Sequence, residues 1–249
     1  MRERGVLTVA RIDGEYGSTL AFTKQILRRQ LSSLFSFAQA KEGAVLDRAA
    51  DDAMRRSLKC FGHIKNKYYH RDGRPVFDPF HSGQYSIFLY YLSNTVSRLE
   101  AQHRSLADRI YYLNKALNSV DLYHEVELPD IFGLDHPLGS VMGRASYSDF
   151  FSFAQNCTVG NSRGIYPRFG EDVRMLSGAK VLGDCEIGSH VILSANCYVK
   201  DTNVPSCSIV FGSSPVLDIK HKPLDYFMER MKARFVIPET NAQDRQDSV

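Results

Sequence analysis

The residues best suited to chemistry lie in the stretch GLDHPLG, residues 133 to 139. It places a carboxylic acid, Asp135, directly beside an imidazole, His136, among Gly, Leu and Pro residues. An imidazole titrates near neutral pH, so it can accept and release a proton under working conditions. His136 is therefore a candidate general base, although a histidine outside a protein interior is more often an ordinary solvated side chain.

A six-residue period dominates the chain after residue 119, and this period must position the candidate base. Neither an α-helix, with 3.6 residues per turn, nor a β-strand, which alternates every two residues, produces such spacing. It is typical of a parallel β-helix, in which each hexad supplies a short strand and a corner. The bulky positions are Phe169, Met175, Val181, Ile187, Leu193 and Val199, and the smaller ones are Val173, Ala179, Cys185, Val191 and Cys197.

The same rule extends upstream with a one-residue slip. Three hexads form one triangular coil in the left-handed form of this fold, so the pattern predicts roughly four coils. The register breaks between Val159 and Phe169, and the insert GNSRGIYPR is expected to project as an external loop. The upstream interior positions are Leu122, Leu128 and Leu134, followed by Val141, Tyr147, Phe153 and Val159.

Helical spacing precedes this region, from about residue 19 to residue 118. The Gly- and Pro-rich stretch 61 to 83 predicts a long connection. Two helices follow it, the first mostly buried and the second opened by a capping box at Ser105 and Asp108. The apolar faces before the connection are Leu27, Leu31, Leu34 and Phe35, then Leu46, Ala50, Met54, Leu58 and Phe61.

The predicted fold class is therefore α+β, an N-terminal α-helical domain followed by a left-handed parallel β-helix of hexapeptide repeats. We expect the helical domain at 1–118, the β-helix at 119–220, and a closing helix with a flexible polar tail at 221–249.

Composition narrows the possible functions. The 249 residues carry a net charge of +3, and no basic run is interleaved with aromatic residues, so no nucleic-acid partner is expected. No apolar run reaches the length of a signal peptide or of a membrane span, which predicts a soluble, cytoplasmic protein. The five cysteines form no C-x-x-C pair and are expected to be small buried residues, neither a disulfide framework nor a zinc site.

Two segments carry a resemblance to a known family. The run VDLYHEVELPDIFGLDHPLGSVMG, residues 120 to 143, resembles the serine acetyltransferases, whose V-D-I-H-P and L-D-H-x-x-G motifs align without a gap from Val120 to Gly139. The run beginning YPRFGEDVRMLSGAKVLG resembles that family's hexapeptide segment. The resemblance implies transfer of an acetyl group from acetyl-CoA to a hydroxyl, with His136 as general base and Asp121 holding the imidazole in the required tautomer.

The resemblance also implies where the substrates bind. Asp135 matches the residue that contacts the ammonium group of the acceptor. Acetyl-CoA is expected along the groove between neighbouring β-helices, and no metal is expected. A homotrimer is the expected minimum, with a dimer of trimers as the larger assembly. The residues expected beside acetyl-CoA are Gly160, Asn161, Ser177 and Ala195, with Lys220 near the nucleotide phosphates.

One departure from the family affects the acceptor. The family has an R-H pair before a proline in the loop, where this chain has Ile165 and Tyr166 before Pro167. Arg163 or Arg168 is a candidate replacement for the lost charge, and Tyr166 remains a candidate acceptor-binding residue. The acceptor can therefore be serine or a sugar hydroxyl of a surface polysaccharide. A metal hydrase and a non-catalytic β-helix scaffold are the other function classes, and His190 is interpreted as a surface residue without a catalytic partner.

Overall fold

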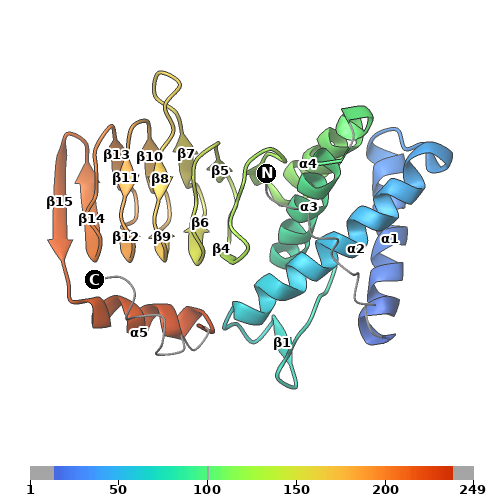
Figure 1. Cartoon of the computed structure of the whole chain (residues 1–249), viewed down its shortest axis with the longest axis horizontal. Helices are drawn as coiled ribbons and strands as arrows, with labels where there is room; N and C mark the ends of the chain where they lie inside the picture. The colour runs from blue at the N-terminus through green and yellow to red at the C-terminus, as the bar shows by residue number, and fades with distance from the viewer. Residues whose placement is uncertain (1–13, 100, 238–249) are drawn as a thin grey trace, which may run out of the picture.

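The structure is a computed structural model that describes residues 14–99 and 101–237. Figure 1 shows an elongated molecule with a group of helices at one end and a stack of short strands at the other. The predicted fold class, α+β with helices before a parallel β-helix, is confirmed. The polar tail predicted at the C-terminus, residues 238–249, lies outside the described residues.

Four helices form the N-terminal part within the described residues. They are α1 (Gly14–Leu34), α2 (Gln39–His63), α3 (Ser82–Ser97) and α4 (Arg104–Asn118), with the short 3-10 turn η1 (Ala101–His103) before α4. The long connection contains a small hairpin of β1 (His70–Arg71) and β2 (Arg74–Pro75). Most predicted core positions of α1 and α2 are buried, including Leu27, Leu31, Leu46, Ala50, Met54 and Phe61, whereas Leu34 is exposed.

The predicted capping box at the start of α4 is wrong. The helix begins at Arg104, and its N-cap residue His103 makes no side-chain cap hydrogen bond. Because η1 leads directly into α4, Ser105 already lies in the first helical turn. Asp108 instead has a tertiary partner, since its Oδ1 lies 2.8 Å from Nε2 of His124.

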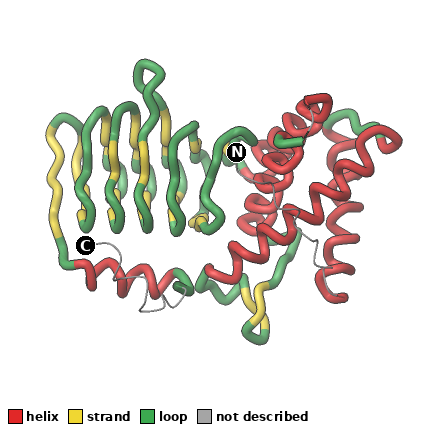
Figure 2. Tube along the Cα trace, in the orientation of Figure 1, coloured by secondary structure: helices red, strands yellow, loops and turns green. Residues whose placement is uncertain are grey.

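The six-residue period forms a parallel β-helix, whose stacked coils are seen in Figure 2, and the strand pairing divides it into three faces. The first face stacks β3 (Asp121–Leu122), β5 (Val141–Met142), β7 (Thr158–Gly160), β10 (Lys180–Leu182) and β13 (Tyr198–Lys200). The second face stacks β4 (Phe132–Asp135), β6 (Phe151–Ala154), β9 (Val173–Met175), β12 (Val191–Leu193) and β14 (Ser208–Ser213). The third face pairs β8 (Arg168–Phe169) with β11 (Glu186–Ile187).

The predicted interior positions from Phe169 to Val199 are confirmed, because both the bulky and the small set are buried. Upstream, one predicted interior position is wrong, because Met142 and not Val141 faces the interior. Val141 is 40% exposed, while Met142 is 1% exposed and pairs with Leu122 and Val159. Leu122 and Met142 are 20 residues apart rather than 18, so the first coil contains two extra residues where the sequence pattern allowed one.

The described part of the β-helix is also longer than the roughly four coils predicted. Five strands stack on the first face, and the interior continues to Val204 and Val210. These two residues pair with Ile187 and Leu193, each 17 residues earlier. The hexad rule missed them because the last coil is one residue shorter than a regular coil.

The insert after β7 forms the predicted external loop, which projects beyond the coils in Figure 1. Its backbone pairs Ser162 with Ile165 in both directions at 3.0 Å. Arg163 and Gly164 make the turn, and both have positive φ angles, 54° and 81°. A two-residue turn with this geometry is typical of a tight hairpin.

The C-terminal segment folds back over the β-helix. Strand β15 (Val216–His221) pairs antiparallel with β14, and α5 (Leu224–Arg234) runs back along the β-helix to the end of α2 (Figure 1). The predicted closing helix is therefore confirmed. Phe227 and Met231 are buried, and the backbone beyond α5 pairs with the chain after α2 through an Ile64–Phe235 bridge.

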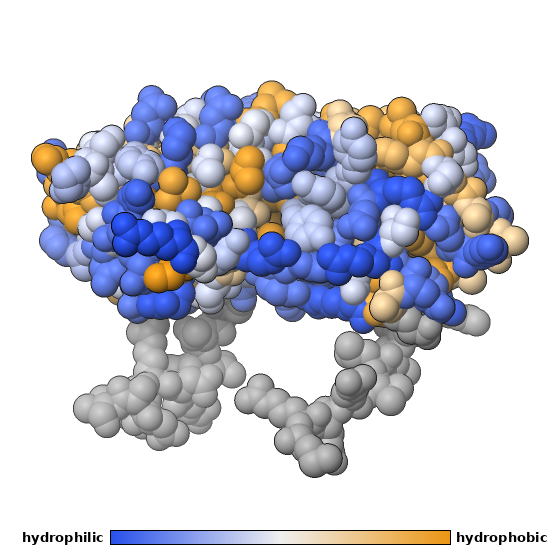
Figure 3. Space-filling model, turned by 90° about the horizontal axis from the view of Figure 1, so that it is seen from above, coloured by the Kyte–Doolittle hydropathy of each residue, from blue (hydrophilic) through white to orange (hydrophobic). Residues whose placement is uncertain are grey.

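Figure 3 shows apolar side chains scattered among hydrophilic ones on the upper face. Within the described residues, no helix has the length and apolar character needed to cross a membrane. Four of the five cysteines are buried, as predicted, and Cys207 is partly exposed.

Candidate active site

His136 lies at the corner that follows β4. Its φ angle is 49°, and its carbonyl accepts a hydrogen bond of 2.8 Å from the Leu138 amide, which holds the chain in a tight turn. The side chain is 88% exposed, and Nε2 lies 4.0 Å from Oδ1 of Asp135. An imidazole in this setting is open to an incoming substrate and keeps both ring nitrogens available.

Asp121 lies at the start of β3, near the same corner. Its Oδ1 accepts a hydrogen bond of 2.7 Å from the Tyr111 hydroxyl, and its Oδ2 accepts one of 2.5 Å from Lys115. Burial and the bond to Asp121 raise the pKa of Tyr111, and the bond to Asp121 raises the pKa of Lys115. In this arrangement Asp121 is held by α4, and its pairing with His136 stays a prediction.

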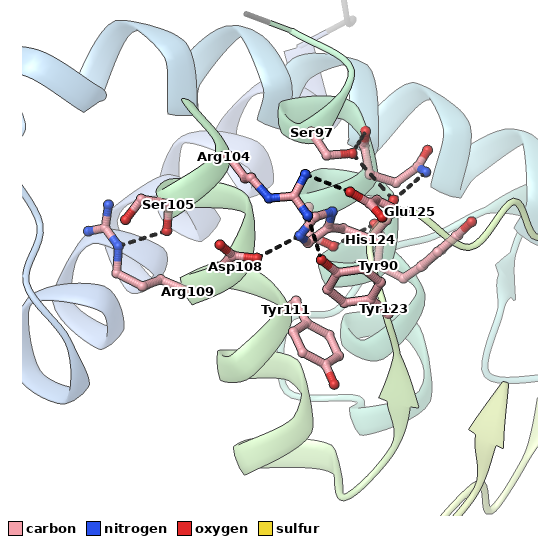
Figure 4. Close-up of polar contacts among 12 residues, drawn as sticks. Tyr90, Ser97, Arg104, Ser105, Asp108, Arg109, Tyr111, Tyr123, His124 and Glu125 are labelled. Carbon is pink, nitrogen blue, oxygen red and sulfur yellow. Dashed lines mark hydrogen bonds and ion pairs between the residues drawn. The ribbon is translucent and has the colours of Figure 1, made fainter. Parts of the chain in front are cut away.

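A second histidine–carboxylate pair joins α4 to the first coil (Figure 4). The His124 side chain is fully buried, and its Nε2 lies 2.8 Å from Asp108 Oδ1. The other ring nitrogen has no hydrogen-bond partner among the described residues. Beside this pair, Arg104 donates to the Tyr123 hydroxyl at 3.0 Å. This cluster fixes the helical part against the β-helix, and the sequence pattern gave no sign of it.

A pocket of about 240 Å³ opens beside Asp135. Its wall includes Arg174, which points outward from β9 between two interior residues. Nη2 of Arg174 lies 3.9 Å from Oδ2 of Asp135. Arg174 was not predicted as a site residue, because Lys180 occupies the same place in the next hexad and the pattern does not distinguish the two. The pocket is lined by Ile64, Lys65, Asn66, Gly133, Leu134, Asp135, Ser152, Arg174, Ala233, Arg234 and Phe235.

A buried ionic network supports this pocket from behind. Arg234, near the end of α5, donates to Ser152 Oγ at 2.8 Å and to Asp172 Oδ1 at 2.7 Å. Nδ1 of His190 lies 3.2 Å from the other Asp172 oxygen, which corrects the interpretation of His190 as a partnerless surface residue. Burial lowers the pKa of Arg234, and the hydrogen bond to Asp172 raises the pKa of His190.

Two of the residues expected beside acetyl-CoA share the corner of His136. Strand pairing aligns β4 with β6, β6 with β9 and β9 with β12, so Ser177 and Ala195 occupy the position of His136 in later coils. Ala195 is exposed and Ser177 is partly exposed. The structure therefore brings these three residues into one column along the β-helix.

The other expected residues lie elsewhere. Gly160 ends β7, and Asn161 enters the external loop, where its side chain contacts the Tyr166 hydroxyl at 3.4 Å. Arg163 is exposed in the turn of the loop hairpin. Lys220 lies on β15, 3.3 Å from Asp218. No group of three or more His, Cys, Asp or Glu side chains suited to a metal occurs in the part of the chain that the structure describes.

Comparisons with known proteins agree with the fold and with the resemblance to the serine acetyltransferases. No protein-family model matches the chain. A serine acetyltransferase of Staphylococcus aureus is 31% identical over 121 residues, which cover 46% of this chain and 56% of that protein. The chain therefore matches little more than half the length of this relative. The resemblance to the serine acetyltransferases is confirmed over that segment.

Solved structures show the same architecture. The serine acetyltransferase of Neisseria gonorrhoeae has a TM-score of 0.58 at 20% identity, covering 74% of this chain and 72% of that one. A serine acetyltransferase in complex with CoA has a TM-score of 0.56 at 20% identity, covering 70% of this chain and 74% of that one. At this identity the likeness establishes the fold.

Proposed function

We propose that this protein is an acetyl-CoA-dependent O-acetyltransferase that acts on the hydroxyl of a small acceptor. The observation that carries the proposal is the position of His136. It stands on an open corner of the β-helix beside Asp135, within the segment that aligns without a gap to the serine acetyltransferases. The 31% identity to the Staphylococcus aureus enzyme supports the same reaction class.

In the proposed reaction, His136 accepts the proton of the acceptor hydroxyl while the oxygen attacks the thioester carbonyl carbon. The carbon–sulfur bond then breaks, the acetyl group stays on the acceptor oxygen, and the sulfur of CoA takes the proton back from the imidazolium. A neutral hydroxyl is a poor nucleophile, and a positioned base typically accelerates such a step by about 10²–10⁴-fold.

Asp121 is proposed to orient the imidazole. Backbone hydrogen bonds support this role, because the Gly139 amide donates to the Ser119 carbonyl and so ties the turn after His136 to the chain before Asp121. To reach His136, the Asp121 carboxylate must turn away from Tyr111 and Lys115. The proposal thus includes a side-chain rotation at this corner.

The column above His136 suits the pantetheine arm of acetyl-CoA. Ser177 and Ala195 have small side chains, so a ligand can approach the backbone there. Coils stack at about 4.8 Å, which places Ala195 about 14 Å from the level of His136. We propose that Gly160, Asn161 and Lys220 complete the donor site in a homotrimer, with Lys220 near the phosphates.

The test is an acetyl-transfer assay that detects free CoA and acetylated product. His136→Ala should lower turnover at least about a hundredfold and leave CoA binding, measured by calorimetry, nearly unchanged. His70→Ala is the matched control, because this histidine lies in the β1–β2 hairpin of the helical part and not in the β-helix. Equal loss of turnover and CoA binding would make His136 a structural residue.

A sugar O-acetyltransferase is the second candidate. It is favoured by one observation, the absence of a cation at Ile165 and Tyr166 in the external loop. A panel of serine and sugar acceptors in the same assay separates the two. A protein that binds CoA and acetylates none of them would be a scaffold.

A further inference from the structure

We infer that Arg174 binds an anionic group of the acceptor, in a pocket that the C-terminal helix α5 closes. The inference rests on the proposed acetyl transfer and names the acceptor class, a small alcohol that carries a carboxylate or a phosphate. It assigns the acceptor anion to the second face of the β-helix rather than to the external loop.

The pocket is assembled from parts of the chain that are remote in sequence. The second face supplies Asp135, Ser152 and Arg174, the chain after α2 supplies Lys65, and the end of α5 supplies Arg234. Three cations and one carboxylate therefore line a small space. Its volume of about 240 Å³ is below the range of about 300–1,000 Å³ that is usual for drug-sized ligands.

Arg174 and Lys65 are the two lining cations whose side chains form no hydrogen bond within the described residues, and of these two Arg174 is the one that lies beside Asp135. Both terminal nitrogens of Arg234 are already engaged by Ser152 and Asp172. Arg174 forms no hydrogen bond within the described residues, and its closest carboxylate, Asp135, is 3.9 Å away, beyond hydrogen-bond distance. Its side chain is 34% exposed, so a solute can reach the guanidinium, whose planar fork suits a carboxylate or phosphate.

The pocket is coupled to the candidate base through a single side chain. One oxygen of Asp135 lies 4.0 Å from Nε2 of His136, and the other lies 3.9 Å from Nη2 of Arg174. The carboxylate of Asp135 therefore lies between the imidazole of His136 and the guanidinium of Arg174, about 4 Å from each. An acceptor that reaches both must be small, with its hydroxyl a few bonds from its anionic group.

The two arginines nearest the external loop are placed differently. Arg163 lies in the turn of the loop hairpin, and Arg168 lies on the third face with Glu186 at 3.6 Å. Figure 1 shows the loop and α5 at opposite edges of the β-helix. Within one chain, the cation beside Asp135 is therefore Arg174.

The experiment compares four acceptors with acetyl-CoA: L-serine, glycerate, glycerol 3-phosphate and serinol, which has hydroxyls and an amine without an anion. Arg174→Gln removes the charge, and Arg174→Lys keeps it without the fork. Arg168→Gln is the matched control on another face. The readouts are kcat, the KM for each acceptor and the KM for acetyl-CoA.

We expect at least one anionic acceptor to exceed serinol in kcat/KM. Arg174→Gln should raise the KM of that acceptor about 10- to 100-fold, the worth of a charge-assisted hydrogen bond. The KM for acetyl-CoA should be unchanged in Arg174→Gln. The Arg168→Gln variant should keep wild-type values of kcat and of both KM values. Arg174→Lys should recover part of the loss. The comparison of glycerate with glycerol 3-phosphate decides between carboxylate and phosphate.

Two results would overturn the inference while acetyl transfer stands: serinol as the best acceptor, or an anion preference that survives Arg174→Gln. If no acceptor is acetylated, the proposed reaction fails, and calorimetric titration of L-serine, glycerate and glycerol 3-phosphate without acetyl-CoA still tests the pocket. Binding that Arg174→Gln weakens would support it. No binding, or equal binding by the variant, would refute it.

Discussion

Arg234 and Asp172 form a salt bridge of 2.7 Å that ties the end of α5 to the corner before β9, 62 residues earlier in the chain. The Asp172 side chain is only 3% exposed, and its second oxygen faces His190. One buried carboxylate therefore neutralises the cation of α5 and holds the helix where it closes the pocket beside Asp135.

Breaking this salt bridge should destabilise the protein. Asp172→Asn leaves the largely buried Arg234 without a countercharge, and removing one partner of a buried pair typically costs about 3–5 kcal/mol. Asp218→Asn is the control, because its pair with Lys220 is exposed and worth less than about 1 kcal/mol. Urea unfolding measures both. Equal midpoints for the two variants would show that the buried pair contributes little.

Stability should also depend on pH through His190. The hydrogen bond to Asp172 raises its folded pKa above the usual value of 6.5. The contribution is fully present below that usual value and is lost as the pH rises through the raised folded pKa. Glu171, Asp172 and Arg234 are the charged groups around it. His190→Gln should flatten the decline in the free energy of unfolding above neutral pH, whereas His221→Gln should leave the decline in place.

The interior phase at β5 gives a test with adjacent residues. Met142 is 1% exposed inside the coil, so Met142→Ala should cost about 2–5 kcal/mol. Val141 is 40% exposed on the outer surface, and Val141→Ala should cost less than about 1 kcal/mol. Chemical denaturation compares the two. A larger loss of stability for Val141→Ala than for Met142→Ala would show that Val141 is the interior residue, as the hexad pattern predicts.

The external loop should be removable without loss of the fold. Val159 and Val181 are paired neighbours 22 residues apart, whereas Val181 and Val199 are 18 apart. Deleting residues 162–165 restores the regular spacing, so the melting temperature should change by only a few degrees, roughly the effect of 1 kcal/mol. Deleting residues 183–186, inside a regular coil, should abolish cooperative unfolding. Collapse of both variants would mean that the loop supports the coils.

Two substitutions distinguish the proposed catalytic role of Asp121 from its hydrogen bonds to α4. Asp121→Asn should lower kcat at least about tenfold, since an imidazole without its carboxylate partner is a less well-oriented base. Tyr111→Phe removes one of the present partners of Asp121 and should leave kcat near wild type. Full activity of Asp121→Asn would show that Asp121 does not orient the base, and a lowered melting temperature of that variant would then give it a structural role.

The sequence by itself determined the coil architecture. Interior positions such as Met175, Val181 and Leu193 repeat every six residues because each short strand and corner uses a similar length of chain, so a local pattern encodes the fold. The same local logic identified the external loop between Val159 and Phe169. It failed where a coil gains or loses residues, as between Leu122 and Met142, because such changes leave the spacing elsewhere intact.

Only the tertiary structure decided what surrounds the candidate base. Arg174 gains its significance because α5 doubles back and places Arg234 beside it. His190 acquires Asp172 because equal positions in successive coils stack, and Asp121 is held by Tyr111 and Lys115 because α4 packs against the first coil. The contact of Arg234 with Asp172 joins residues 62 positions apart, and it depends on how α5 packs, which the six-residue period does not specify. His190 and Asp172 are one regular coil apart, 18 residues, so their contact follows from the stacking of the coils.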